Sequence, residues 1–181
     1  KTERDQLQRR VPNLLGADVP SGKTDHDNAE ISRWGTPPTF AFEPRHHVEL
    51  GALTDTIDFE RAAKVTGSNF YYLKNEAVLL ELALCSWAMN RLVKKQFAPL
   101  LTPDLARDAI LDGIGFAPRG PERQVYNIAD TDMSLVGTAE ITVGGYHADE
   151  ILEPDHLPRR YVGLSHCFRT EAGAHGNESK G

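Results

Sequence analysis

The sequence predicts an α+β fold, because helix-like segments alternate irregularly with strand-like segments of the antiparallel type. The strongest observation is an apolar, helix-periodic run over residues 77–97. A second is a set of short apolar and aromatic runs bounded by glycine or proline, which indicate strands at 70–74, 97–103 and 159–172. We find no internal repeat and no low-complexity tract.

The composition is typical of a soluble globular domain. The chain has 181 residues, 40% of them hydrophobic and 25% charged, which suffices for one domain with a core and an appendage. The net charge of −6 argues against a nucleic-acid surface over the whole segment, although it allows a local basic patch. No apolar run has the length of a transmembrane helix. Cys85 and Cys167 are expected to be buried thiols.

The N-terminal part is predicted to be a short helix followed by a linker. Residues 1–10 are highly charged, with Leu7, Val11 and Leu14 at helical spacing, and Pro12 should end the helix. Residues 16–39 are rich in Gly, Pro, Asp and Ser, which is typical of a linker. The first ten residues lack the apolar stretch of a signal peptide. They also lack an initiator methionine, so we expect the true start of the protein to be missing.

The next elements follow from capping residues and apolar periodicity. A helix is expected over 58–65, with Asp58 as its N-cap and Gly67 as its stop. The aromatic run 70–74 indicates a strand, and the long helix over 77–97 ends in cations that suit the helix dipole. One face of this helix should be formed by Val78, Leu82, Cys85, Met89 and Leu92.

In the C-terminal half, residues 112–123 are predicted to form a loop and 124–129 a strand. Thr138 is expected to cap a helix beginning at Ala139, which Gly144 and Gly145 would weaken. Residues 159–172 are predicted to form one long strand. In such a strand Arg169 and Glu171 would share a face, and the small residues after them would form a turn or loop.

Three motifs invite a functional interpretation that their surroundings do not support. The SGKT sequence at 21–24 lacks the glycine spacing, the preceding strand and the following helix of a phosphate loop, so we predict a turn. The pair His46 and His47, with Glu49, is not expected to bind a metal, because adjacent histidines point apart and the sequence offers no further ligand set. We predict surface or hydrogen-bonded histidines. His166 beside Cys167 is interpreted in the same way, as a surface or hydrogen-bonded histidine.

Two further motifs leave alternatives open. In GTAE, residues 137–140, Glu140 lies in a first helical turn and would stay ionised, where it could hold a ligand ammonium. A helix N-cap explains the same residues without any ligand. Arg169 and Glu171 form either a solvated salt bridge of small value or the floor of a polar site.

Taken in order, these segments resemble the seryl-tRNA synthetases, a branch of the class II aminoacyl-tRNA synthetases. VPN and DVPSGKTDHDNAEISRWGTPP resemble the link between the family's tRNA-binding helical arm and its catalytic domain. The segment from HHVELG at residue 46 to LELAL at residue 84 resembles the entry to that domain. Helix 78–96 with FAPLLTP resembles motif 1, LVGTAE resembles the serine-site loop, and SHCFRTEAG resembles the first strand of motif 2. The segments SHCFRTEAG and GTAEITVGG are most similar in sequence to the bacterial and organellar branch of the family.

The resemblance implies an antiparallel class II sheet flanked by helices, incomplete here and preceded by the end of the helical arm. The arm remnant would be 1–15, the linker 16–39, and the N-terminal part of the catalytic domain 40–181, with motif 3 absent. The chain would end inside the motif 2 loop, so the fragment alone is expected to be inactive.

The resemblance also implies residue roles. Arg169 would be the catalytic residue, holding the α-phosphate of ATP and the serine carboxylate. Thr170 and Glu171 would bind ATP with it, and the loop 174–180 would meet ATP or the tRNA end. Serine would be held by Thr138, Ala139 and Glu140, and the motif 1 residue Pro103 would lie at a dimer interface.

The implied activity is that of a serine–tRNA ligase. The implied partners are L-serine, ATP, tRNA(Ser) and a second copy of the chain, with Mg²⁺ bound by ligands downstream, no metal ligand visible in this chain and no membrane association. The compartment would be the cytoplasm or an organelle. An alternative is a synthetase-like paralogue with a binding or regulatory role, or a ligase that loads amino acids onto a carrier protein. The helical arm separates the two, because carrier-loading relatives lack it.

Overall fold

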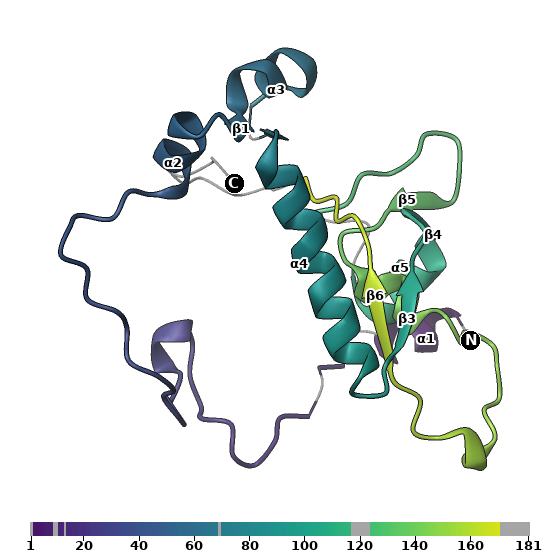
Figure 1. The fold of residues 1–181 in the computed structure, drawn as a ribbon. Helices are drawn as coiled ribbons and strands as arrows, with labels where there is room; N and C mark the ends of the chain where they lie inside the picture. Colours follow the sequence, from purple (N-terminus) through teal and green to yellow (C-terminus); the bar gives the residue numbers. More distant parts are fainter. Residues whose placement is uncertain (1, 9–10, 13, 69, 117–123, 171–181) are drawn as a thin grey trace. The chain divides into compact units, whose positions relative to one another are not determined.

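The computed structural model describes the chain apart from residues 1, 9–10, 13, 69, 117–123 and 171–181 (Figure 1). The described residues fall into two compact units, Lys1–Pro44 and Arg45–Gly181. In the first unit, helix α1 spans Thr2–Gln8, in agreement with the helix predicted at the N-terminus. The described residues from 11 to 44 contain only one further regular element, the 3-10 turn η1 at Asp25–Asp27, and they are exposed.

The SGKT segment forms the predicted turn. The backbone amides of Lys23 and Thr24 donate to Oδ2 of Asp27 at 2.7 and 3.1 Å. These contacts hold the pKa of the Asp27 carboxyl below its usual range. The amides that a phosphate loop would offer to a nucleotide are therefore bonded to a carboxylate of the chain itself.

The second unit contains six strands, five α-helices and one 3-10 turn among its described residues. Its elements alternate irregularly along the chain, as the α+β prediction requires. They are α2 (His47–Leu53), β1 (Ile57–Asp58), α3 (Phe59–Thr66), β2 (Tyr72–Leu73), α4 (Glu76–Val93), β3 (Ala98–Leu101), β4 (Leu105–Arg107), α5 (Asp108–Ile114), β5 (Met133–Leu135), α6 (Ala139–Gly144), η2 (Pro154–His156) and β6 (Tyr161–Leu164).

The strands pair two by two. The pairs β1–β2 and β4–β5 are antiparallel, as predicted for the sheet type. The pair β3–β6 is parallel, with Ala98 opposite Tyr161, a pairing that the antiparallel expectation did not include. A parallel pair requires a long crossover, and here β4, α5, β5 and α6 supply it.

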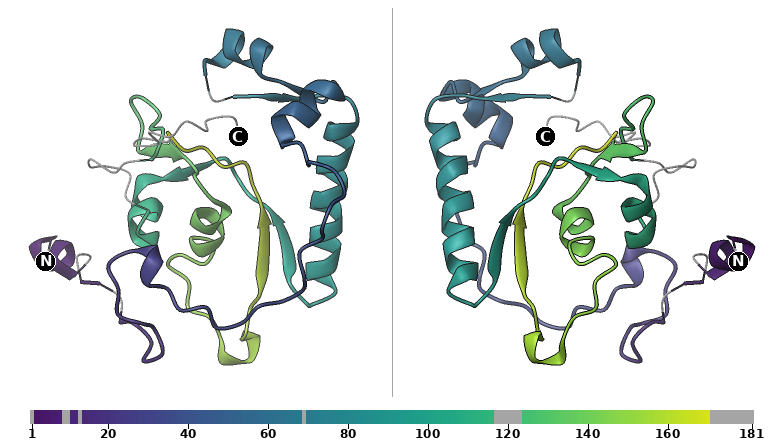
Figure 2. Two further views of the ribbon diagram at one scale, coloured as in Figure 1. Left: turned by 90° about the vertical axis from the view of Figure 1, so that its left-hand side faces the viewer. Right: turned by 90° about the vertical axis from the view of Figure 1, so that its right-hand side faces the viewer.

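The described core lies between the antiparallel pair β4–β5, α5 and α6. Leu111, Val125, Val136 and Ile141 are fully buried there, and Phe116 packs against them. Figure 2 shows the β3–β6 pair between α4 on one side and α6 on the other. This packing sets the ends of β4, β5 and β6 beside one another.

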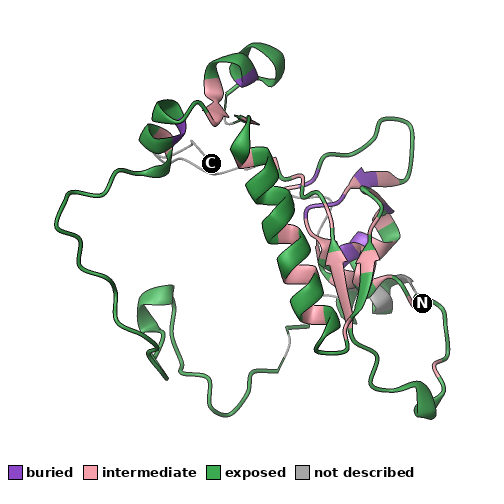
Figure 3. Cartoon of the chain, in the orientation of Figure 1, coloured by how far each residue is buried: buried purple, intermediate pink, exposed green. Residues whose placement is uncertain are grey.

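Helix α4 is much more exposed than its sequence predicts (Figure 3). Of the predicted face, Cys85, Met89 and Leu92 are half-buried, whereas Val78 and Leu82 are 39% and 62% exposed. The helix is apolar around most of its circumference, so a single strip of contact with β3 and β6 covers only part of it. Other large side chains on α4 remain exposed, namely Leu79, Leu80, Leu84 and Trp87.

Several predicted elements are confirmed and others are shorter than expected. Helix α3 has Asp58 as its N-cap and Gly67 as its C-cap, and α6 begins at Ala139 after Thr138, as predicted. The predicted loop 112–123 is wrong at its start, because Asp112–Ile114 is the last turn of α5; residues 117–123 lie outside the described part.

Two strand predictions need correction. Residues 124–129 form only an isolated β-bridge, in which Asn127 lies opposite Ser134 of β5. Among the described residues, they pair with no other strand. The long strand predicted over 159–172 is limited to Tyr161–Leu164, since β3 offers only four residues for pairing. Arg169 therefore does not lie in a strand, and Glu171, expected to share its face, lies outside the described residues.

Candidate functional site

The site is organised around Gly137, which joins β5 to α6. Arg169 Nε donates a hydrogen bond to the carbonyl oxygen of Gly137 at 3.1 Å. The guanidinium carbon lies 5.5 Å from the ring centre of Phe116. Among the described residues, the terminal Nη atoms of Arg169 make no hydrogen bond or ion pair, so its two-pronged end is available to a ligand.

Gly137 is required by close packing. It is buried, and a Cβ atom built on it would lie 2.6 Å from Cζ of Phe116 and 3.4 Å from Cγ of Arg169. A side chain at this position would therefore push the ring or the arginine away. The glycine of GTAE is explained by this contact, which the sequence alone does not reveal.

Thr138 follows Gly137 and caps α6. Its Oγ1 accepts a 3.3 Å hydrogen bond from the backbone amide of Glu140. Thr138 and Ala139 are half-buried, whereas Glu140 is exposed in the first turn of the helix. Because Arg169 is bonded to Gly137, the predicted phosphate-binding arginine and the predicted serine-binding residues are neighbours in the structure.

The segment that carries Arg169 is held by backbone and side-chain contacts. The amide of Val136 donates to the carbonyl of Asp104 at 2.9 Å, and the amide of Phe168 donates to the carbonyl of Val136 at 2.8 Å. Nδ1 of His166 lies 3.0 Å from Oδ1 of Asp104. Val136 is fully buried, so these bonds tie residues 166–169 to the core.

A buried hydroxyl stabilises the strand that leads into the site. Ser134, in β5, is fully buried; its Oγ donates to Asp108 Oδ1 at 2.6 Å and accepts from Asn127 Nδ2 at 2.7 Å. Buried polar groups of this kind are tolerated only when they are hydrogen-bonded. The network joins the start of α5, the bridge residue Asn127 and β5.

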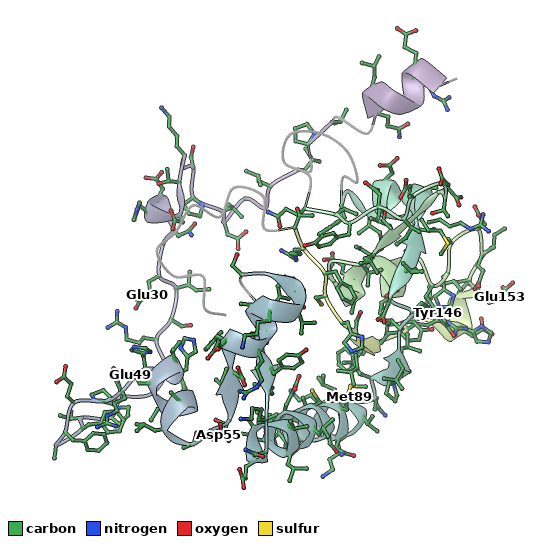
Figure 4. The ribbon with its side chains drawn as sticks, turned by 90° about the horizontal axis from the view of Figure 1, so that it is seen from above. Glu30, Glu49, Asp55, Met89, Tyr146 and Glu153 are labelled. Carbon is green, nitrogen blue, oxygen red and sulfur yellow. The ribbon has the colours of Figure 1, made fainter. Side chains whose placement is uncertain are left out.

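Two other clusters of polar side chains lie away from Gly137. Between α2 and β1, Asp55 accepts from Lys74 Nζ at 2.5 Å, and this bond holds the pKa of the Asp55 carboxyl below its usual range (Figure 4). After α6, His147 lies 2.7 Å from Glu150 Oε2 through Nδ1 and 2.8 Å from the Tyr161 hydroxyl through Nε2. The first cluster links β2 to β1, and the second links the end of α6 to the start of β6.

The aromatic ring of Tyr146 completes the second cluster. It packs edge-on against His147 and Tyr161, with centroids at 4.9 and 5.4 Å (Figure 4). Charged and polar side chains in both clusters are thus bonded to one another. They serve the packing of the elements that they join.

The remaining predicted site residues are placed as follows. Pro103 is exposed between β3 and β4, and Thr170 is half-buried. The loop 174–180 lies outside the described part. The expectation of buried thiols is wrong for Cys167, which is exposed because the strand ends before it, while Cys85 is half-buried; both thiols are free.

The histidines set aside in the sequence are bonded or at the surface, as expected. His46 precedes α2 with Nε2 4.0 Å from Glu49, and His166 pairs with Asp104. No group of three His, Cys, Asp or Glu side chains among the described residues is arranged to hold a metal ion. Within the same residues, no helix has the length and apolarity to cross a bilayer.

Sequence reasoning missed Phe116 and Asp104. Phe116 follows α5 in a segment predicted to be a loop, and Asp104 is 62 residues from its partner His166. Neither residue has a periodic pattern or a motif that points to the site. Their proximity to the site comes from the crossover that brings β4, α5 and β6 together.

Comparison with known proteins supports the resemblance stated above. No family model matches the chain. Serine–tRNA ligase of Dictyoglomus thermophilum is 58% identical over 95% of this chain, and that of Rubrobacter xylanophilus is 54% identical over 96%. The chain spans about 40% of the length of these curated relatives.

Solved structures agree in fold. The crystal structure of seryl-tRNA synthetase from Pyrococcus horikoshii complexed with ATP matches 99% of this chain and 44% of its own, with 38% identity and a TM-score of 0.92. A cytoplasmic serine–tRNA ligase from Naegleria fowleri, at 24% identity and a TM-score of 0.89, shows the same fold. The resemblance of this chain to the seryl-tRNA synthetases is therefore confirmed, over nearly all of the chain and over about 40% of the curated relatives' length.

Proposed function

We propose that the protein containing this chain is a serine–tRNA ligase. It would join L-serine to ATP, releasing pyrophosphate, and pass the seryl group to the 3′ end of tRNA(Ser). The observation that carries the proposal is the hydrogen bond from Arg169 to Gly137, which makes the two candidate binding motifs neighbours. The names of the relatives, serine–tRNA ligases at 54–58% identity, support the same reaction.

In the first step, a carboxylate oxygen of serine attacks the α-phosphorus of ATP. The bond from the α-phosphorus to the oxygen that bridges it to the β-phosphorus breaks, and pyrophosphate leaves with the electron pair. Negative charge gathers on the α-phosphoryl oxygens, so a fixed cation there lowers the barrier. Arg169 supplies that cation in our proposal: Nε is occupied by Gly137, and the two Nη donors face a ligand without a competing partner among the described residues.

We assign the serine side to the start of α6. The Glu140 carboxylate, exposed in the first turn, is the partner for the serine ammonium, with Thr138 and Ala139 forming the adjacent wall. No general base is needed for the attack, because the serine carboxylate is already ionised at neutral pH. Thr170 and Glu171 are assigned to ATP on the strength of the motif alone.

In the second step, a hydroxyl of the terminal tRNA ribose attacks the carbonyl carbon of the seryl-adenylate, and AMP leaves. We propose that residues 1–15 belong to a tRNA-binding arm, 16–39 to a linker and 40–181 to the catalytic domain, with Pro103 at a homodimer interface. Mg²⁺ would neutralise phosphate charge when bound. The described residues contain no group of side chains arranged to hold a metal ion, so we assign no step of the mechanism to Mg²⁺.

The test is serine-dependent exchange between ATP and pyrophosphate, measured on the full-length protein with alanine and threonine as control substrates. We expect exchange with serine and transfer of serine to tRNA(Ser). Absence of exchange from a folded protein would refute the proposal. Exchange followed by transfer to a carrier protein and not to tRNA would favour the amino acid–carrier ligase instead. We place the activity in the cytoplasm or in an organelle, where tRNA is charged.

A further inference from the structure

The side chain of Phe116 lies between the core and Arg169. Its ring centre is 5.5 Å from the guanidinium carbon of Arg169, and its Cζ atom lies 2.6 Å from the position that a Cβ on Gly137 would take. We propose that Phe116 is a positioning residue, whose ring holds the Arg169 guanidinium in the orientation that presents its Nη atoms to the substrate phosphate. That the ligand is a substrate phosphate rests on the proposed function. That the ring orients the guanidinium rests on the observed contact between the two side chains.

The position of the ring is set by the end of α5. Gly115 adopts the left-handed conformation with φ of 83°, which ends the helix, and the amide of Phe116 then donates to the carbonyl of Leu111 at 2.9 Å. Leu111 is fully buried. The backbone of Phe116 is therefore anchored on the core, and the half-buried ring packs against that core.

The guanidinium has two described supports. The hydrogen bond from Nε to Gly137 holds one edge of the plane, and the aromatic ring attracts the cation through its negative face. A hydrogen bond at one edge alone leaves rotation about that bond. The ring restricts this rotation, so the charged fork is oriented before the ligand arrives.

The spacing around Gly137 explains why an aromatic ring fits. The ring contacts the glycine from one side while Arg169 reaches its carbonyl, and a Cβ there would be 2.6 Å from the ring. A leucine at position 116 would keep apolar packing on Leu111 but would remove the flat, electron-rich face. Tyrosine would keep that face.

The first experiment compares Phe116→Leu, Phe116→Met and Phe116→Tyr in the full-length protein. For the Leu and Met variants we expect kcat of ATP–pyrophosphate exchange to fall about 2- to 30-fold, the range of a cation–π contact. The KM for serine, which depends on the α6 side, should change less than about twofold. Phe116→Tyr should restore kcat to near the parent value. An unchanged kcat in folded Leu or Met variants would overturn the proposal.

A double-mutant cycle separates positioning from general damage. In an Arg169→Ala background, Phe116→Leu should cause no further loss of kcat, because the residue acts through Arg169. Equal loss in both backgrounds would overturn the proposal. Urea unfolding of each variant identifies those that fold. If Phe116→Leu does not fold, Phe116→Met takes its place in the cycle.

A readout independent of activity uses the ¹⁵N-labelled arginine side chains. In the parent protein the Arg169 Nε–H signal should exchange slowly with water and be displaced from the signals of arginines that have no aromatic neighbour, and both properties should be lost in Phe116→Leu but kept in Phe116→Tyr. An Arg169 signal indifferent to Phe116 would refute the positioning role even if the enzyme is active. The signal can respond as expected even if serine-dependent exchange is absent, in which case only the proposed reaction fails.

Discussion

Arg169 Nε donates a 3.1 Å hydrogen bond to the carbonyl oxygen of Gly137, a residue 32 positions earlier in the chain. This one bond connects the segment after β6 to the loop between β5 and α6. It occupies the donor nearest the side-chain stem and directs the terminal nitrogens elsewhere. Binding of a phosphate by those nitrogens would therefore need no rearrangement of the bond to Gly137.

Replacing Arg169 by alanine should lower kcat of serine-dependent exchange by at least about 10²–10³-fold, the effect of removing one preorganised charge donor. Arg169→Lys should recover only part of this loss, because an ammonium lacks the planar fork. Arg33→Ala, which removes an exposed arginine paired with Glu30, is the matched control and should leave exchange unchanged. Exchange near the parent rate in folded Arg169→Ala would make Arg169 structural.

Glu140→Gln should raise the KM for serine about 10- to 100-fold, because the neutral amide loses a charge-assisted bond to the ammonium. The KM for ATP should change little. Steady-state exchange at varied serine measures both constants. Glu153→Gln, at an exposed glutamate just before η2 (Figure 4), is the control. An equal rise of KM in both variants would argue against a specific ammonium site at Glu140.

Ser134→Ala should destabilise the protein by about 1–3 kcal/mol, because Asp108 and Asn127 lose a buried hydrogen-bond partner. Ser32→Ala, at an exposed position in the first unit, should change stability by less than about 0.5 kcal/mol. Urea denaturation of both variants measures the difference. If the two variants unfold at the same urea concentration, the network contributes nothing to stability.

The N-terminal end of α3 should become less stable as the pH falls and Asp58, its N-cap, is protonated. The backbone amide of Arg61, and then its guanidinium, hold the pKa of the Asp58 carboxyl below its usual range. A depressed folded-state pKa adds stability above the unfolded value of about 4 and loses it as pH falls through the folded value. Hydrogen exchange of the Arg61 amide should therefore lose protection below about pH 4 in the parent protein.

The matched variant is Asp58→Asn, which keeps a capping oxygen but does not titrate. Its protection factor at the Arg61 amide should be lower than the parent's at neutral pH and nearly constant on acidification. A parallel loss of protection in both proteins would show that another group controls the end of this helix.

Local signals in the sequence were sufficient for the capped helices. Asp58, Gly67 and Thr138 mark the ends of α3 and the start of α6, and all three cap as predicted. These features depend on residues within one turn of one another, so they can be predicted without the rest of the chain. The α+β class and the ordered motifs of the family were also evident from the sequence.

Strand lengths and partners were less predictable. The apolar run 159–172 pairs only over Tyr161–Leu164, and it pairs parallel to β3. Strand formation requires a partner of matching length, and an apolar run does not specify that partner. The same reason applies to residues 124–129, which form a single bridge.

The sequence by itself therefore determined the caps, the long apolar helix and the identity of the two candidate binding motifs. Only the tertiary structure decided that Arg169 reaches Gly137, that Phe116 lies over the guanidinium, and that Asp104 pairs with His166. Each of these contacts joins residues far apart in the chain. Their geometry depends on the crossover between β3 and β6 and on the packing of α5, which no short stretch of sequence encodes.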